Sequence, residues 1–249
     1  GSGVTHLKPK AALAGHREHS ALRLVHEYEG RDGLQPVQVH LLSNGHYHVG
    51  LTQTGAGASR WQDISINRWR DDALTQEHGV WVAVRRETDT AVLPTTYRLD
   101  MTPPEAYKAT FEPHRAVFDR QDGDLHMQTR VMVCPEQDAE IRRITLENRS
   151  AQEIHLEVTL FFELALCAQA DDLAHMAFRN LFIHTALQDG VLWARRRPRT
   201  PGEAVPHLAC RTIGADGPIA QLEVETDRSL CLGRGRKWQN ARMFQGKRP

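Results

Sequence analysis

The amino-acid sequence predicts a mainly β protein, a large antiparallel sandwich preceded by one helix. From Val37 onward, short segments alternate apolar and polar residues, which is the period of a half-buried strand. Asn-Gly and Asp-Gly pairs, which favour tight hairpin turns, lie between several of these segments. Residues 11–28 stand apart because their apolar side chains recur at helical spacing. These three observations set the fold class.

The predicted helix spans residues 11–28. One face of it would carry an apolar stripe of Leu13, Ala21, Leu22, Leu24 and Val25. Gly30 follows as a stop signal, and Arg31-Asp32-Gly33 reads as a turn. Gly1-Ser2-Gly3 has the composition of a tag remnant. We therefore expect residues 1–36 to form a tag remnant and helical leader, and residues 37–249 to form the β domain.

Strands are expected throughout the first half of the β domain. His46–Thr52 follows the turn Ser43-Asn44-Gly45, and a second glycine-rich turn follows at Gly55-Ala56-Gly57. Asp122-Gly123 should join two further strands in a hairpin. The strands expected here are residues 46–52, 80–86, 107–111, 115–120 and 125–133.

The second half continues the pattern, with residues 139–148 and 154–166 expected to pair with one another. Ile141, Ile144 and Leu146 should lie near one face of the first of these strands, with an irregularity at Arg142-Arg143. Asp171 should cap a short helical turn over residues 171–178. Further strands are expected at residues 180–187, 191–196, 207–213 and 219–225.

Composition excludes several classes of partner. The 249 residues include 31 basic and 31 acidic side chains, for a formal net charge of +0. Binding to nucleic acid or to an anionic membrane surface needs a basic excess, so we expect neither nucleic-acid binding nor direct membrane contact. No apolar run approaches the roughly 20 residues of a membrane span. A neutral polyol such as a glucan fits this charge balance.

Cysteine and histidine usage gives no sign of a cofactor. Cys134, Cys167, Cys210 and Cys231 are widely spaced and lie in or beside apolar runs, as expected of free thiols in a reducing cytoplasm. His46 and His48 would share one face of a strand, but no third metal ligand accompanies them. The sequence also lacks a nucleophile elbow, a zinc-protease motif and a phosphate-binding loop. We therefore predict no metal, no cofactor and no catalytic residue.

A dense polar and aromatic run follows the second glycine-rich turn. Indole rings can stack on the C–H faces of pyranose rings while arginine and aspartate bond to the hydroxyl groups. In the alternative interpretation, Trp61 and Trp69 cap a core and the charges pair with one another. We expect a split, with Trp69 structural and the earlier residues nearer to sugar. The candidate carbohydrate-binding residues are Arg60, Trp61, Asp63, Arg68, Trp69, Arg70 and Asp71.

Many ordered motifs resemble a known family. They include residues 40–47 (HLLSNGHY), 55–61 (GAGASRW), 67–72 (NRWRDD), 118–124 (FDRQDGD), 142–148 (RRITLEN) and 232–236 (LGRGR). Together they resemble the opening of the phosphorylase-like module of cyclic β-1,2-glucan synthases, which is similar to the cellobiose and chitobiose phosphorylases of glycoside hydrolase family 94. The resemblance covers roughly residues 37–236. His46 and Asn67 stand where the family leads us to expect Arg and Thr, and Met176 stands where we expect Pro.

The resemblance implies an antiparallel β super-sandwich like that of galactose mutarotase. In this family, catalysis belongs to a helical barrel that follows the sandwich, and the chain ends at Pro249 before any such barrel. The implied role is a non-catalytic carbohydrate-binding and supporting domain that helps to shape the glucan site and a dimer interface. The implied partners are a glucan or oligosaccharide, the barrel domain and a second copy of the chain. The implied location is cytoplasmic, within a synthase associated with the inner membrane.

Two other functions stay open at this stage. The first is a free-standing mutarotase-like enzyme, which would need two histidines and a glutamate converging on one sheet. The second is a scaffold that serves only for oligomerisation. Convergence on a sheet depends on strand pairing, so only a structure can test the first of these.

Overall fold

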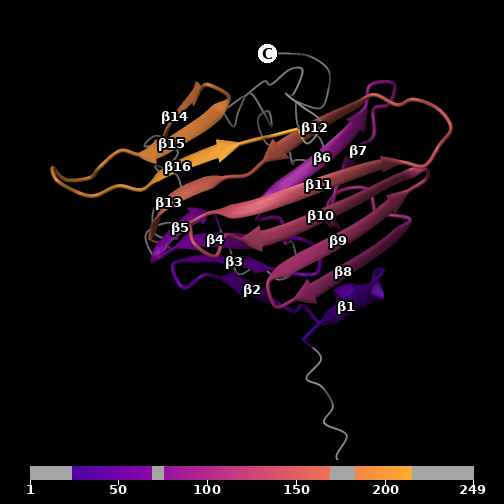
Figure 1. The fold of residues 1–249 in the computed structure, drawn as a ribbon, viewed down its shortest axis with the longest axis horizontal. Coiled ribbons are helices and arrows are strands. Elements are labelled where there is room, and N and C mark those ends of the chain that lie inside the picture. The colour runs from indigo at the N-terminus through magenta and orange to yellow at the C-terminus, as the bar shows by residue number, and fades with distance from the viewer. Residues whose placement is uncertain (1–23, 69–75, 169–182, 215–249) are drawn as a thin grey trace, which may run out of the picture.

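The computed structural model describes residues 24–68, 76–168 and 183–214. Within them the chain forms strands β1 to β16 and one short 3-10 helix, η1 (Asp32–Leu34). The strands make four antiparallel sheets, here called sheets A to D (Figure 1). The predicted mainly β fold is confirmed.

Sheet A is the five-stranded layer that lies nearest the viewer in Figure 1, with the strand order β1-β8-β9-β10-β11. The turn at Asp122–Leu125 joins β9 and β10 in register, so the predicted Asp-Gly hairpin is confirmed. The strands of sheet A are β1 (His26–Glu29), β8 (Ala106–Glu112), β9 (Arg115–Asp122), β10 (Leu125–Val133) and β11 (Glu140–Asn148).

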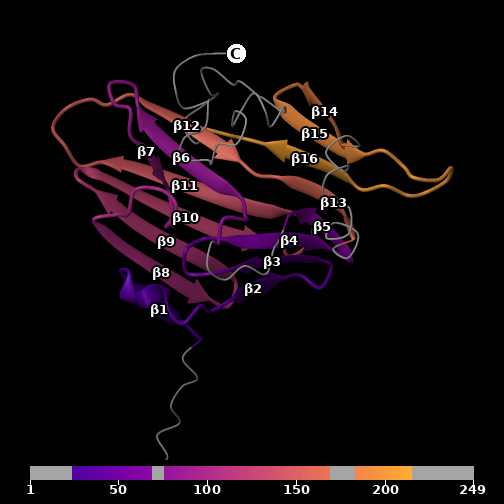
Figure 2. The ribbon, with the colours of Figure 1, turned by 180° about the vertical axis from the view of Figure 1, so that it is seen from behind.

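Sheets B and C lie behind sheet A in Figure 1 and face the viewer in Figure 2. Sheet B has the order β13-β5-β4-β3-β2, and sheet C has the order β12-β6-β7. Sheet B contains β2 (His40–Ser43), β3 (Tyr47–Leu51), β4 (Gly57–Trp61), β5 (Ile64–Asn67) and β13 (Leu164–Ala168). Sheet C contains β6 (Trp81–Arg86), β7 (Val92–Pro94) and β12 (Leu156–Phe161).

Sheet D contains β14 (Ile183–Gln188), β15 (Val191–Arg196) and β16 (His207–Arg211), in that order. It lies beside β13 in both ribbon views (Figures 1 and 2). The guanidinium Nε of Arg196 donates a hydrogen bond to the carbonyl of Leu166 at 3.0 Å, which ties β15 to β13. Ala194, on the same strand, is buried in the main core.

The main core fills the space between sheets A and B. Val49 and Leu51 of β3 pack in one cluster with Ala109 and Phe111 of β8 and with Phe118 of β9. A second cluster joins Val84 of sheet C to Leu125 and Met127 of sheet A. Burial of alternate side chains from both layers is the main stabilising term in such a sandwich.

The predicted N-terminal helix is wrong where the structure describes it. His26–Glu29 is a strand that pairs antiparallel with β8, and Tyr28 packs on Phe111 with 5.3 Å between the ring centroids. Leu24 and Val25, assigned to the apolar stripe, are exposed. Pairing with the edge of a sheet outweighs helical spacing here, since helix propensity is a weak preference. Residues 11–23 lie outside the described residues.

The predicted pairing of residues 139–148 with residues 154–166 is wrong. β11 pairs with β10, whereas β12 pairs with β6. The predicted strand 154–166 is also two strands, because after Phe161 the chain leaves sheet C and joins sheet B as β13. Arg68 secures this crossover, since its backbone N–H donates to the carbonyl of Glu163 at 3.0 Å.

The inward face of β11 also differs from the prediction. Alternation is regular along the strand, so Ile144 and Leu146 face the core while Ile141 is exposed on the outer face. Arg142 therefore points inward, with Glu140 beside it. The expected irregularity at Arg142-Arg143 is absent from this described strand. Glu140 and Arg142 therefore occupy inward positions of β11, where an alternating strand normally places apolar side chains.

The glycine-rich turn between β3 and β4 forms as predicted. The N–H of Thr52 donates to the carbonyl of Ala56 at 2.8 Å. Gly55 has a φ of +87°, and a Cβ at Gly57 would lie 1.9 Å from the carbonyl oxygen of Gly50. Only glycine allows the two strands to approach so closely at this point.

Several further predictions can be compared with the structure only in part. Cys134 and Cys210 are free thiols and Cys167 is buried, while Cys231 lies outside the described residues. The helical turn at residues 171–178 and the strand at residues 219–225 lie outside them too. Among the residues that the structure covers, no helix is long and apolar enough to cross a membrane.

Candidate functional site

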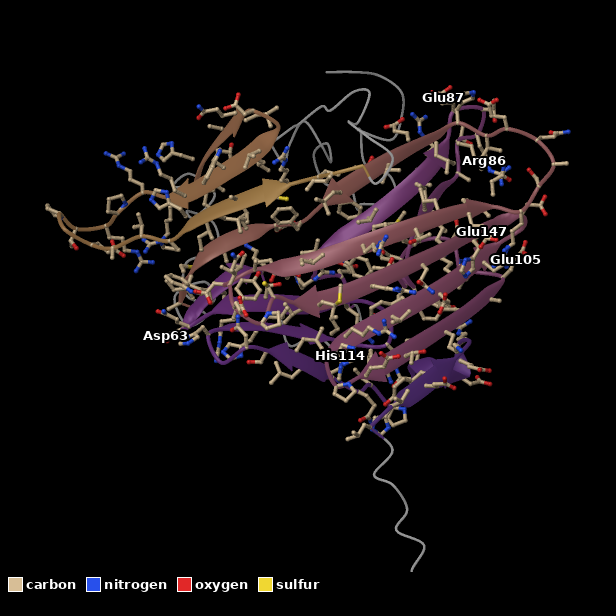
Figure 3. All side chains as sticks on the ribbon, viewed as in Figure 1. Asp63, Arg86, Glu87, Glu105, His114 and Glu147 are labelled. Atoms are coloured by element: carbon tan, nitrogen blue, oxygen red, sulfur yellow. The ribbon has the colours of Figure 1, made fainter. Side chains whose placement is uncertain are left out.

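Three segments meet at one end of the sandwich, and we call this end the Trp61 rim. They are the turn 44–47, the turn 61–64 and the loop 134–140. Asn44 Nδ2 donates to the carbonyls of Cys134 and Gln137 at 3.0 and 2.9 Å, which joins sheet B to sheet A. The N–H of Gln62 donates to the carbonyl of His46 at 2.8 Å. Asp63 marks this end of the molecule in Figure 3.

Glu140 is the centre of a polar network beneath the rim. Its Oε1 accepts hydrogen bonds from the hydroxyls of Tyr47 at 2.9 Å and Ser59 at 2.5 Å. Its Oε2 accepts from Arg142 Nε at 2.9 Å. The side chains of Glu140 and Arg142 are only 16% and 13% exposed. Arg142 also reaches the carbonyl of Val80 at 3.3 Å, so one ion pair connects sheet A to two other segments.

The surroundings of Glu140 favour its ionised form. Burial alone would raise the pKa of this carboxyl, but the charge of Arg142 and the hydrogen bonds from Ser59 and Tyr47 lower it below its ordinary value. Burial and the neighbouring carboxylate raise the pKa of the Tyr47 hydroxyl. A carboxylate held in this way accepts hydrogen bonds and links the segments that donate them. It is poorly suited to donating a proton as a general acid near neutral pH.

The lowered pKa of Glu140 leads to a pH-dependent stability. Because its pKa is below the ordinary value of 4.5 in the folded chain, the carboxylate stabilises the fold above that pH. This contribution is lost as the pH falls through the folded-state pKa. The free energy of unfolding of wild type should therefore exceed that of Glu140→Gln most at neutral pH, with the difference shrinking as the pH falls below 4.5. Urea unfolding across this range measures it. A difference that grows on acidification would contradict the assignment.

Trp61 lies at the end of β4 with its ring against the main core. Its indole Nε1 donates to Asp138 Oδ2 at 2.7 Å. Trp61 is partly exposed, so the core does not enclose it completely. The core-cap interpretation of Trp61 is supported by this packing, and its predicted role in stacking on sugar stays a prediction.

Of the other described members of the predicted cluster, Asp63 shares the rim with Trp61, whereas Arg60 and Arg68 do not. Arg60 is exposed and belongs to the opposite face of β4, where it lies between His48 and Ser65 in register. Asp63 is exposed in the β4–β5 turn. Arg68, which follows β5, pairs through Nη1 with Glu163 Oε2 at 3.3 Å. Trp69, Arg70 and Asp71 lie outside the described residues, so their predicted roles stay predictions.

The network residues were missed by sequence reasoning. Tyr47 on β3 and Ser59 on β4 are far along the chain from Asp138, Glu140 and Arg142, which lie in or just before β11, so no single short motif joins all five. The sequence did contain one indication of this network. Glu140 and Arg142 alternate in phase with Ile144 and Leu146, which places charge at inward positions of a strand. Inward charges of this kind need partners within the fold.

The described residues contain no group of three or more His, Cys, Asp or Glu side chains that could hold a metal ion. On the outer face of sheet A, His126 lies 3.3 Å from Asp119 and 3.5 Å from Glu147. Glu147 is at the end of the sandwich opposite to Asp63 (Figure 3). A mutarotase-like site needs two histidines and a glutamate on one face. In sheets A to D, no described face brings these three groups together.

Comparison with known proteins supplies the family. The model of the glycosyl hydrolase 94 supersandwich domain matches residues 24–248. The cyclic beta-(1,2)-glucan synthase NdvB of Rhizobium meliloti (strain 1021) is 34% identical over 209 residues, which cover 82% of this chain. The chain spans only 7% of the length of that relative. The matching residues begin just before β1, so the family domain includes the strand that replaces the predicted helix. The chain belongs to the supersandwich domain family of glycosyl hydrolase 94.

Proposed function

We propose that this chain is a non-catalytic domain that supports and partly lines the glucan site of a cyclic β-1,2-glucan synthase. The family match over residues 24–248 carries the proposal, together with the relative named as such a synthase. We further propose that the chemical step belongs to a separate helical barrel. In this view the domain faces the cytoplasm within a synthase associated with the membrane.

Two carboxylates at the Trp61 rim, Glu140 and Asp138, support a non-catalytic role. Glu140 is held by Arg142 and two hydroxyls, and Asp138 accepts the bond from Trp61. Glycoside hydrolysis needs a pair of carboxyl groups that face each other across an open cleft, and phosphorolysis still needs one carboxyl group ready to donate a proton. Neither of these two groups meets that requirement.

The construction of the rim supports a lining role. Three segments from two sheets are joined there by side-chain bonds to backbone and carboxylate groups, which fixes the position of the Trp61 ring. A rigid aromatic side chain offers a sugar contact at low entropic cost. We propose that the Trp61 side chain, rather than a catalytic group, is what the domain presents to the glucan. A dimer interface on the same domain is part of the proposal.

The proposal predicts a specific kinetic change in a protein that joins this domain to its catalytic barrel. Trp61→Ala should raise KM for linear β-1,2-glucan by about tenfold with little change in kcat, since a stacking contact of about 1.5 kcal/mol is lost from bound substrate. Arg60→Ala is the matched variant, because Arg60 lies on the opposite face of β4. It should leave KM within twofold. If KM is unchanged in Trp61→Ala, the Trp61 rim does not line the glucan site.

A further inference from the structure

Sheet D presents an exposed tryptophan to solvent. Trp193 is in β15, the central strand, and its side chain is 45% exposed. The neighbouring residue, Ala194, points the other way and is buried in the main core. The face that carries Trp193 is therefore the outer face of sheet D. This face forms no part of the Trp61 rim.

Small side chains flank the ring on both sides. Ala186 of β14 and Ala209 of β16 are the direct cross-strand partners of Trp193. Neighbouring strands are about 4.8 Å apart, so a larger residue at either position would cover part of the indole. Two alanines leave it open. An uncovered indole between methyl groups is a flat apolar platform about three strands wide.

A row of hydrogen-bonding groups lies one step along the sheet from the ring. Arg195 is the next residue of β15 on this face, and it pairs in register with His184 and His207. All three are exposed. Residues two apart on a strand are separated by about 6.6 Å, so this row lies at the edge of a ring-sized ligand over Trp193. On the other side of Trp193, Gln188 and Arg211 line the same face.

The side chains on the outer face of sheet D indicate which class of ligand it binds. No acidic side chain occupies this face within β14, β15 and β16, and Trp193 is its single exposed large apolar group. The core of a protein interface needs several buried apolar side chains within about 800 Å² per partner, which this face lacks. One indole with surrounding donors matches a pyranose ring with hydroxyls at its edge.

We propose that the outer face of sheet D is a second glucan-binding surface, with Trp193 as the stacking platform and Arg195, His184 and His207 as hydrogen-bonding groups. The ligand class is a neutral β-glucan chain, which rests on the proposed function of the domain. Sheet D lies beside β13, at the end of the sandwich that carries the Trp61 rim (Figures 1 and 3). A long glucan bound at sheet D is thereby held near the rim without any catalytic contact.

Affinity electrophoresis of the 249-residue chain tests this proposal. Native gels contain either linear β-1,2-glucan, dextran sulfate or no polymer. Wild type should be retarded by the glucan, and Trp193→Ala should bind about tenfold more weakly because the stacking contact is lost. Trp193→Phe should keep part of the retardation. Leu187→Ala is the matched control, since Leu187 is also exposed but points to the opposite face of the same sheet.

The outcomes separate this proposal from the function of the domain. If Trp193→Ala is retarded as strongly as wild type, sheet D is not the binding surface, while glucan binding by the domain stands. If wild type is not retarded by glucan, the sheet D proposal fails, while the proposed lining role is still decided by the KM of Trp61→Ala in the protein that contains the barrel. Retardation by dextran sulfate alone would mean that the face takes an anionic polymer, which also overturns the proposal. Melting curves of the variants should coincide with wild type, because Trp193 is a surface residue.

Discussion

Replacing Arg142 by alanine is expected to lower the free energy of unfolding by about 3–5 kcal/mol, because it leaves the carboxylate of Glu140 without its cation. Both side chains are largely shielded from water, and Arg142 holds Oε2 of Glu140 at 2.9 Å. For a chain of this size the loss corresponds to a decrease in Tm of roughly 6–20 °C. Thermal unfolding followed by circular dichroism measures it.

Arg143 provides a neighbouring control. It is exposed on the outer face of β11, one residue from Arg142 and in the same strand. Arg143→Ala should change stability by at most about 0.5 kcal/mol, since it removes no buried partner. Equal losses in the two variants would mean that the ion pair does not hold the sheets together. The double variant Glu140→Gln/Arg142→Met should be less destabilised than the sum of its parts, because no uncompensated charge remains.

The second large effect is expected at Trp81. This ring is 2% exposed and forms a cluster with Phe161, its partner in register on β12, and with Ala83. Arg98 lies over the ring, with its guanidinium carbon 4.8 Å from the ring centroid. Trp81→Ala should cost about 3–5 kcal/mol, since it empties a buried site and removes the cover of a buried cation.

Urea unfolding of Trp81→Ala and Trp81→Phe measures this effect. The phenylalanine variant should lose less stability, because a ring still covers Arg98 although the bond from Trp81 Nε1 to the carbonyl of Glu77 is lost. Trp193→Ala is the control at an exposed tryptophan, with an expected change within about 0.5 kcal/mol. If Trp81→Ala were as stable as that control, sheet C would not depend on this cluster.

Local patterns predicted the hairpins of sheet A well. Residues 125–133 were predicted with the bounds that β10 has, because strict alternation and an Asp-Gly turn act within a few residues of each other. The pairing of β12 with β6 was missed, since it joins residues 70 to 80 positions apart. Long-range pairing depends on which faces need burial across the whole fold, and a single strand carries little of that information.

The predicted helix failed for a related reason. His26–Glu29 has no strong strand signal of its own, and β1 exists because the edge of β8 is available to it. The sequence could have shown that Arg60 and Trp61 face opposite sides of the sheet. Consecutive residues of a strand point in opposite directions, so this follows once Gly57–Trp61 is recognised as a strand.

The central claim is that this supersandwich domain contributes to a glucan site without performing the reaction. The most direct measurement is the release of glucose 1-phosphate from linear β-1,2-glucan by the purified chain in the presence of inorganic phosphate. The proposed function predicts no release above the background without protein. Release that depends on phosphate and is abolished by one carboxylate substitution, such as Glu140→Gln or Glu147→Gln, would contradict it.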